Sequence, residues 1–303
     1  MRLSTCRAGG RTIAAAELLG GHVDLLRAHE ARGRGRDGRE WFGSVLDLIR
    51  GGDRALDAAR DALAFAEREG DPAAPFILPA GEVRLLAPIP RPGKILCSGI
   101  NYRGHLEENP GAKLPETPFF FSKLPSAVIG PGEPIVHPAA TSQLDYEVEL
   151  AVVIGRSLHR AREPEVLPAL AGYTILHDVS ARDVQFKDNQ ITLGKNFDTF
   201  APMGPCLVTP DEVPDPADLR LLSLVNGRAL QDSSTRDWVF PLPFLIASLS
   251  RVMTLEPGDV VSTGTPAGVG FFRKPPVFLK PGDTVTLEIE RVGRLENPVI
   301  AET

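Results

Sequence analysis

The pattern of hydrophobic and polar residues changes near residue 85 of the chain. Beyond that point, short runs that are apolar throughout, or that alternate apolar and polar residues, recur between Pro- and Gly-rich turns, which is typical of β-strands. These runs are 94–100, 118–123, 145–155, 171–180, 205–209, 219–230, 259–265 and 283–290. The dipeptide Asn226–Gly227 between two apolar stretches predicts a β-hairpin, and residues 241–255 are the best helix candidate of this region.

The first 80 residues differ, because they are rich in Ala, Arg and Gly and read as partly helical. Apolar residues recur at helical spacing over 41–52 and again over 55–70, and glycines end both patterns. Prolines then accumulate between residues 72 and 92. We therefore expect an α/β domain over residues 1–85 and a larger strand-rich domain over residues 86–303, in an α+β, mostly β fold.

Composition excludes several classes of function. The 303 residues include 33 Lys and Arg against 39 Asp and Glu, a net charge of −6, which argues against nucleic-acid binding. No apolar run is long enough to predict a membrane span, and three widely separated cysteines without a CxxC motif suit a reducing cytoplasm. The chain also lacks a phosphate-binding P-loop, a serine nucleophile elbow and a dinucleotide-binding glycine motif.

The stretch LDYEVEL places three carboxylates, Asp145, Glu147 and Glu149, at alternate positions. Side chains two residues apart share one face of a strand, so two neighbouring carboxylates can converge on a cation. If that face were buried without a cation, repulsion and desolvation would raise at least one carboxyl pKa. Taken alone, the stretch favours a simpler alternative, in which an exposed antiparallel strand turns its acids towards water.

Two further groups of polar residues reduce the weight of that alternative. Asp178 lies where an apolar run ends, and Arg182 and Gln185 follow at positions that share one face if the chain becomes helical. The alternative for Asp178 is a helix N-cap. His105 precedes Glu108 by three residues, so the two can meet on one helical turn as a general base acting on water, or else His105 is a surface residue.

From about residue 90 to its end, the chain resembles the fumarylacetoacetate hydrolase family, and most of all the bacterial branch labelled acylpyruvate hydrolases and hydroxy-heptadienedioate isomerases. Six segments in family order carry the resemblance: 99–108 (GINYRGHLEE), 118–135 (PFFFSKLPSAVIGPGEPI), 144–155 (LDYEVELAVVIG), 172–185 (GYTILHDVSARDVQ), 193–208 (LGKNFDTFAPMGPCLV) and 256–270 (EPGDVVSTGTPAGVG). The resemblance implies a β-roll of mixed strands, a smaller N-terminal domain and, usually, a homodimer.

The resemblance also implies roles for individual residues. The implied metal ligands, normally for Mg²⁺ although Mn²⁺ or Ca²⁺ can replace it, are Glu147, Glu149 and Asp178. The implied catalytic residues are His105, Glu108 and Lys195, of which the first two form a water-activating dyad. The implied substrate-binding residues are Tyr102, Arg182, Gln185, Gly264 and Thr265. Asp145 matches no family role.

These residue types allow several reactions on a 2-oxo acid. Three carboxylates suit a hard cation, which would stabilise an enolate of the substrate. The His105–Glu108 pair favours hydrolysis of the C–C bond of a 2,4-dioxo acid such as an acylpyruvate or fumarylpyruvate. The alternatives are oxaloacetate-type decarboxylation or tautomerisation, double-bond isomerisation, a tailoring reaction on a larger β-dicarbonyl compound, and metal binding without activity. The Pro- and Gly-containing residues 107–118 are expected to form a lid that sets substrate size.

Overall fold

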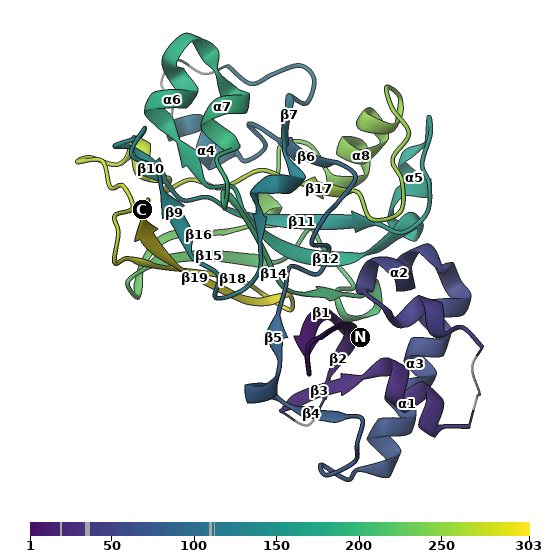
Figure 1. Cartoon of the computed structure of the whole chain (residues 1–303). Helices are drawn as coiled ribbons and strands as arrows, with labels where there is room; N and C mark the ends of the chain where they lie inside the picture. The colour runs from purple at the N-terminus through teal and green to yellow at the C-terminus, as the bar shows by residue number, and fades with distance from the viewer. Residues whose placement is uncertain (19, 34–36, 109–110, 112) are drawn as a thin grey trace.

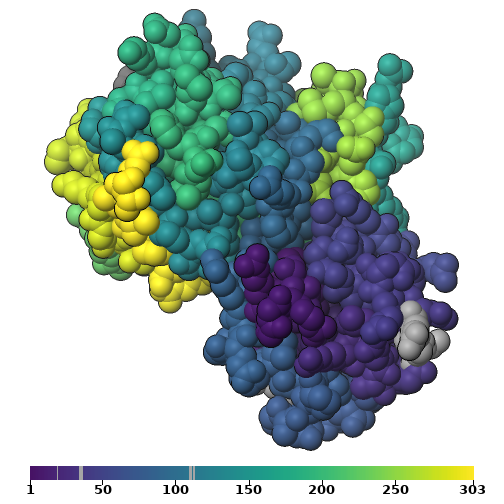
Figure 2. Space-filling model, viewed as in Figure 1, coloured from purple at the N-terminus to yellow at the C-terminus, as the bar shows by residue number. Residues whose placement is uncertain are grey.

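The computed structural model describes residues 1–303 except residues 19, 34–36, 109, 110 and 112. A smaller N-terminal lobe lies beside a larger body that contains most of the chain (Figure 1). Figure 2 shows the lobe, coloured purple to blue, projecting from one side of the body. None of the described helices has the length and apolar character that crossing a membrane would require.

The N-terminal lobe packs helices against antiparallel strands that form one end of the larger sheet (Figure 1). Its elements are β1 Arg2–Ala8, β2 Arg11–Leu18, β3 Gly21–Asp24, α1 Leu25–Ala31, α2 Val45–Arg50, α3 Gly52–Glu69, β4 Ile77–Pro79 and β5 Arg84–Leu85. Buried alanines recur every three or four residues along α3, so a face of small side chains packs closely on its neighbours. Gly70 ends α3 in the left-handed conformation, which a glycine adopts without steric cost.

The body is built mainly of strands. Its strands are β6 Ile95–Ser98, β7 Phe120–Lys123, β8 Val128–Ile129, β9 Ile135–His137, β10 Leu144–Asp145, β11 Val148–Ile154, β12 Leu170–His177, β13 Ser180–Ala181, β14 Ala201–Val208, β15 Arg220–Val225, β16 Arg228–Ser234, β17 Val260–Ser262, β18 Thr284–Ile289 and β19 Gly293–Ala301. Its helices are α4 Arg103–Glu108, α5 Glu163–Val166, α6 Arg182–Phe186, α7 Ile191–Lys195 and α8 Leu242–Ser250.

The described strands form two main sheets of mixed direction. The larger sheet runs β4-β3-β2-β1-β14-β12-β11-β17-β6-β7, and the smaller runs β16-β15-β18-β19-β9. Most pairs are antiparallel, but β17–β6, β14–β8 and β19–β9 are parallel. Strand β11 lies in the interior of the larger sheet, and all of its residues and all of those in β12 are buried. A strand covered on both faces needs an apolar sequence, which explains the run that follows Glu149.

The structure confirms the mostly β fold with mixed strands and most of the expected elements. The Asn226–Gly227 turn joins β15 to β16 with positive φ at both residues, as the hairpin signal predicted. The hydrophobic pattern did not single out β1–β3, and β1 pairs with β14 of the body, which makes the sheet continuous between lobe and body. The division into domains at residue 85 stays a prediction.

Candidate active site

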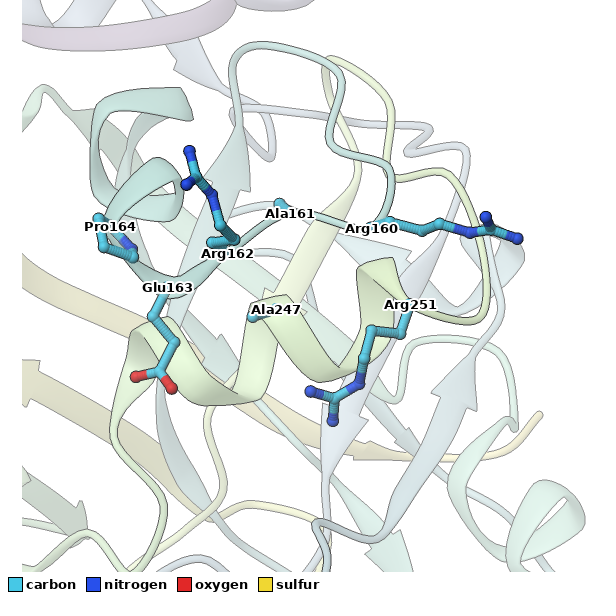
Figure 3. Close-up of a pocket in the computed structure, with 7 residues that line it drawn as sticks. All are labelled: Arg160, Ala161, Arg162, Glu163, Pro164, Ala247 and Arg251. Carbon is cyan, nitrogen blue, oxygen red and sulfur yellow. The ribbon is translucent and has the colours of Figure 1, made fainter.

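Two hollows in the body differ in the residues that line them. One, of about 680 Å³, lies between α8 and the segment that leads into α5. Its arginines Arg160, Arg162 and Arg251 extend in different directions and do not converge on a common point (Figure 3). The other is a smaller cavity of about 190 Å³, and it is lined by every predicted site residue except Tyr102, Glu108 and Gly264. The chemistry predicted from the sequence therefore lies in the smaller cavity.

Two strand ends bring three carboxylates together beneath this cavity. Val148 at the start of β11 pairs with His177 at the end of β12, so Glu147 and Asp178 lie next to each other just outside the paired region. One oxygen from each of Glu147, Glu149 and Asp178 lies within 4.8 Å of the others. All three side chains, here called the carboxylate triad, are buried, which overturns the alternative of an exposed acidic strand.

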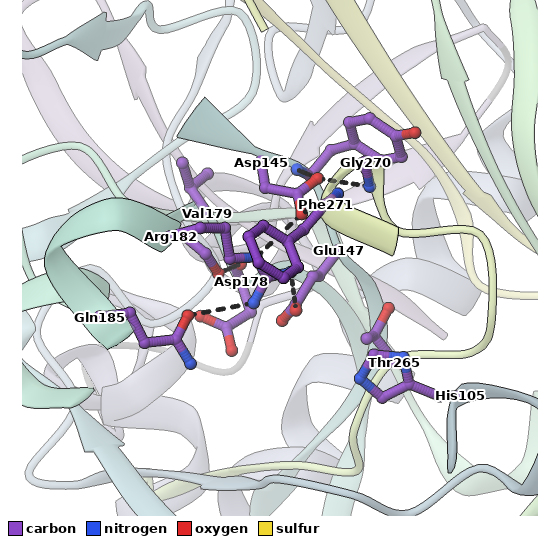
Figure 4. Close-up of polar contacts among 12 residues, drawn as sticks. His105, Asp145, Glu147, Asp178, Val179, Arg182, Gln185, Thr265, Gly270 and Phe271 are labelled. Carbon is purple, nitrogen blue, oxygen red and sulfur yellow. Dashed lines mark hydrogen bonds and ion pairs between the residues drawn. The ribbon is translucent and has the colours of Figure 1, made fainter. Parts of the chain in front are cut away.

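Three buried cations surround the triad. The Lys195 ammonium donates to Glu147 at 2.8 Å and to Asp178 at 2.7 Å. Lys123 donates to the other oxygen of Asp178 at 2.6 Å, and Arg182 donates to Glu147 at 2.5 Å (Figure 4). Burial alone would raise the pKa of Glu147, but the adjacent Arg182 and Lys195 outweigh it and hold that pKa well below its ordinary value.

Glu149 differs from the other two members of the triad, because it has no cationic partner among the described residues. Its carboxylate accepts hydrogen bonds from the Ser262 hydroxyl at 2.5 Å and from the Gly264 amide at 3.2 Å. Burial raises the pKa of Glu149 well above its ordinary value, and the neighbouring charges of Asp178 and Glu147 raise it further. The Glu149 carboxylate is therefore stabilised either by binding a proton or by an additional cation beside it.

The triad fits a hard divalent cation. Its ligand atoms are all carboxylate oxygens, the donor type that Mg²⁺, Mn²⁺ and Ca²⁺ prefer. Together with the buried Asp145, the described cluster contains four carboxylates but three cations, Lys123, Arg182 and Lys195. A divalent cation would compensate the charge that Glu149 leaves without a counter-ion.

Asp145, which matched no family role, is completely buried beside the triad. It belongs to the two-stranded β10–β13 pair, and the chain leaves this strand before β11 begins. Its carboxylate accepts from Nε of Arg182 at 2.8 Å and from the backbone amides of Gly270 and Phe271 (Figure 4). LDYEVEL is therefore not one continuous strand, and its first acid lies outside the triad, although it shares Arg182 with Glu147.

At the other end of the cavity, the predicted contact between His105 and Glu108 is present on helix α4. Nδ1 of His105 lies 3.2 Å from Oε2 of Glu108, whose other oxygen accepts from the Gly268 amide at 2.6 Å. The carboxylate of Asp237 accepts from the Gly104 amide at 2.9 Å and fixes the first turn of the helix. With Nδ1 directed at a carboxylate, Nε2 is the ring nitrogen that can accept a proton.

The mouth of the cavity is apolar. Phe119 and Phe186 line it and are 47% and 49% exposed, so they lie at its opening. Phe272 lines the cavity beside His105, with the two ring centres 6.0 Å apart. A cavity of this size suits a small substrate.

Some predicted site residues have internal partners. The Gly264 amide donates to Glu149, and the Thr265 hydroxyl lines the cavity but donates to the carbonyl of Val148 at 3.1 Å. Tyr102 is completely buried and does not line the cavity. Substrate contacts by Tyr102, Gly264 and Thr265 stay predictions.

The predicted lid, residues 107–118, connects α4 to the cavity mouth at Phe119. Residues 109, 110 and 112 lie outside the described residues. The role of this segment as a lid stays a prediction.

Comparison with known proteins agrees with this geometry. Residues 94–300 match the family model described as fumarylacetoacetate (FAA) hydrolase C-terminal. The chain belongs to the fumarylacetoacetate hydrolase family. Within this family, it is 44% identical over 258 residues to the rat (Rattus norvegicus) protein "Oxaloacetate tautomerase Fahd2a, mitochondrial", a match that covers 85% of this chain and 80% of that protein.

Two solved structures of family members cover the whole of this chain and were matched over their own full length. A fumarylacetoacetate hydrolase from Exiguobacterium antarcticum is 36% identical, with a TM-score of 0.82. A maleylpyruvate hydrolase from Sphingobium sp. SYK-6, determined with manganese(II) and pyruvate, is 31% identical, with a TM-score of 0.76. The family thus includes proteins named as tautomerases and proteins named as hydrolases, and the similarity alone supports a metal-dependent enzyme of one of these kinds.

Lys123 is a site residue that the sequence analysis missed. It ends an apolar strand, is 1% exposed, and donates to Asp178 and to the carbonyl of Val179 at 3.1 Å. Burial lowers the pKa of Lys123, although the charge of Asp178 opposes the shift. The sequence did contain a signal for this residue, namely a lysine at the end of an aromatic strand. A lysine buried there needs a charged partner, because lysine is seldom fully buried without one.

Proposed function

We propose that this protein interconverts the keto and enol forms of a small 2-oxo acid with the help of a divalent cation, and that oxaloacetate is its first candidate substrate. The buried carboxylate triad beside Arg182 and Lys195 carries the proposal, because it combines a cation site with positive charge for an anionic substrate. The relatives named oxaloacetate tautomerases support the choice of reaction. Tautomerisation thereby takes precedence over the C–C hydrolysis that the sequence favoured.

The triad would hold the cation, for which Mg²⁺ is the first choice, and a bound cation supplies Lewis-acid stabilisation of negative charge on a substrate oxygen. Arg182 has five N–H donors. Three of them have partners among the described residues, namely Asp145, Glu147 and Gln185. The remaining two can bind a substrate carboxylate, and Lys195 adds a second positive charge beside it.

The dyad is suited to moving the proton. Nε2 of His105 can take a proton from the carbon next to the keto group, while Glu108 holds the ring and stabilises its protonated form. Return of that proton to the oxygen completes the conversion to the enol, and the reverse path restores the keto form. The apolar side chains at the cavity mouth limit the access of water to this exchange.

Hydrolysis of the C–C bond of an acylpyruvate is a second candidate, and the geometry of the dyad is compatible with it. A His–Glu pair that lines a cavity can activate a water molecule as well as remove a proton from carbon. The maleylpyruvate hydrolase relative supports this alternative.

One set of assays separates the candidates. The purified protein is given Mg²⁺ and oxaloacetate, and the enol absorbance is followed with and without a chelator, while released pyruvate is measured in parallel. Faster enol–keto exchange without pyruvate supports tautomerisation, and pyruvate from oxaloacetate indicates decarboxylation. Pyruvate formed from acetylpyruvate or fumarylpyruvate indicates hydrolysis. Exchange no faster than with Mg²⁺ alone contradicts the main proposal.

The homodimer implied by the resemblance and the cytoplasmic location expected from the cysteines stay proposals. Light scattering on the eluting protein would decide the first of them.

A further inference from the structure

The carboxylate of Asp145 accepts four hydrogen bonds from three parts of the fold. Oδ1 accepts from the amides of Tyr146 at 2.8 Å and Gly270 at 2.7 Å, and Oδ2 accepts from Nε of Arg182 at 2.8 Å and from the amide of Phe271 at 3.0 Å. A carboxylate has about four acceptor sites, so this side chain is saturated. It is completely buried, and no capacity is left for a metal or a substrate.

One of these contacts, the bond from Arg182, leads to the end of the cavity that holds the triad. Arg182 begins helix α6, and its guanidinium bridges Asp145, Glu147 of the triad and Gln185 at the cavity wall (Figure 4). Because Asp145 accepts from Nε, the planar guanidinium is held in one orientation, with one outer nitrogen donating to Glu147 and the other to Gln185.

Two others, from the amides of Gly270 and Phe271, lead to the end of the cavity that holds the dyad. These amides belong to residues 268–272, here called the 268–272 loop. The Gly268 amide donates to Glu108, and the ring of Phe272 packs edge-on against His105. At Gly270 the backbone approaches so closely that an added Cβ would lie 2.6 Å from the Asp145 carboxylate and 1.9 Å from a backbone oxygen. The loop is therefore held against Asp145 by contacts that leave room only for glycine.

We propose that Asp145 is a positioning residue that aligns the two ends of the active site, by orienting Arg182 and by fixing the 268–272 loop that supports the dyad. The part of this proposal in which Arg182 binds the substrate carboxylate rests on the proposed function. Its statement about the loop is independent of that function. In this role Asp145 neither binds the metal nor carries a proton.

Asp145→Asn tests the proposal whichever way the new amide is turned. Its NH₂ group replaces either Oδ1, facing the donors of Tyr146 and Gly270, or Oδ2, facing those of Arg182 and Phe271. In both cases one loop amide loses its acceptor. We expect hydrogen exchange of the loop amides in the metal-free protein to rise by about tenfold.

Asp183→Asn is the matched control. Asp183 also fastens α6 to the segment before Asp145, by accepting from the Thr141 hydroxyl and the Ser142 amide, but among the described residues it makes no hydrogen bond to the 268–272 loop. Loop exchange should stay at the wild-type rate in this variant. An equal rise in both variants, or no rise in Asp145→Asn, would overturn the proposal. If Asp145→Asn does not fold, Asp145→Glu serves, because a carboxylate one methylene longer cannot meet the same four donors.

Two functional measurements separate positioning from general loss of structure. Calorimetric titration of oxalate in the presence of Mg²⁺ should show binding weakened by about tenfold in Asp145→Asn, with the affinity for Mg²⁺ alone much less affected. In a double-mutant cycle on kcat, Asp145→Asn and Glu108→Gln should together cost less than the product of their separate losses, because both act through one loop. Multiplicative losses, or an equal loss of Mg²⁺ affinity, contradict the proposal.

The failure of the proposed function would be visible separately. If wild-type protein binds neither Mg²⁺ nor oxalate, the proposed function fails, whereas the exchange comparison between Asp145→Asn and Asp183→Asn still decides whether Asp145 fixes the loop.

Discussion

The two ends of the cavity are built in different ways. The triad lies at the ends of interior strands, is almost fully buried and is surrounded by three cations. The dyad lies on the short helix α4, where the side chains of His105 and Glu108 are 13% and 21% exposed. Among the described residues, Asp237 and Gly268 make hydrogen bonds from other segments to this helix. The triad lies on or directly beside the paired strands β11 and β12, so a large movement of its backbone requires the sheet to open, whereas the dyad can adjust through local motion. The cation site is thus the rigid reference against which the dyad is placed.

The largest effect is expected at the rigid end. Glu149→Ala removes one of three oxygen ligands from a site whose other two members already have cationic partners, so Mg²⁺ affinity should fall by more than about a hundredfold. Titration calorimetry on protein freed of metal by a chelator measures this. Ser262→Ala, which keeps the ligand but removes its hydrogen bond, should cost about tenfold. Unchanged affinity in Glu149→Ala would contradict the assignment of the triad.

The next largest effect is expected from substitution of His105, which tests whether the dyad functions independently of the triad. His105→Ala should lower kcat by about 10²- to 10⁴-fold, because the proton acceptor is lost, while Mg²⁺ affinity stays at the wild-type value. Glu108→Gln keeps the shape of the acid and should have a smaller effect on kcat. A fall of Mg²⁺ affinity in His105→Ala would show that the two ends do not function separately.

A smaller effect on catalysis is expected from substitution of Phe186, which lies at the cavity mouth. The ring centre of Phe186 on α6 lies 5.0 Å from that of Phe271 in the 268–272 loop. An aromatic contact of this kind contributes on the order of 1 kcal/mol, so Phe186→Ala should raise KM by about threefold to tenfold with little change in kcat. Steady-state kinetics on the substrate that the assay panel identifies measures both constants. A large fall in kcat would assign Phe186 to the chemistry rather than to the cavity mouth.

The smallest effect concerns the larger hollow. Arg251 donates to the hydroxyl of Ser248 and lies over the ring of Phe244, away from both ends of the cavity. Arg251→Ala should change kcat/KM by less than about twofold, as expected for a surface substitution away from the site. A loss comparable to that of Phe186→Ala would mean that the hollow contributes to function.

Local signals in the sequence predicted elements well where the cause is local. The Asn226–Gly227 turn and the end of α3 at Gly70 follow from backbone conformations that these residues adopt readily. The His105–Glu108 contact follows from helical spacing. Strand β1 was not singled out, although Gly9–Gly10, both with positive φ, join it to β2 in a hairpin and were an available local signal. Its pairing with β14, which joins Leu3 to Leu207, has no local signal.

The active site also combines features that the sequence predicted with features that depend on distant parts of the chain. The sequence determined which residue types were present: alternating acids before an apolar strand, an Asp at the end of another strand, and a His–Glu pair. Only the tertiary structure decided that the chain breaks between β10 and β11, so that Asp145 meets Arg182 and the 268–272 loop while Glu147 and Glu149 join Asp178. It also placed Lys123 against Asp178. The physical reason is that a hydrophobic pattern reports which face of an element is buried, whereas the charge that a buried carboxylate meets depends on segments far away in the chain.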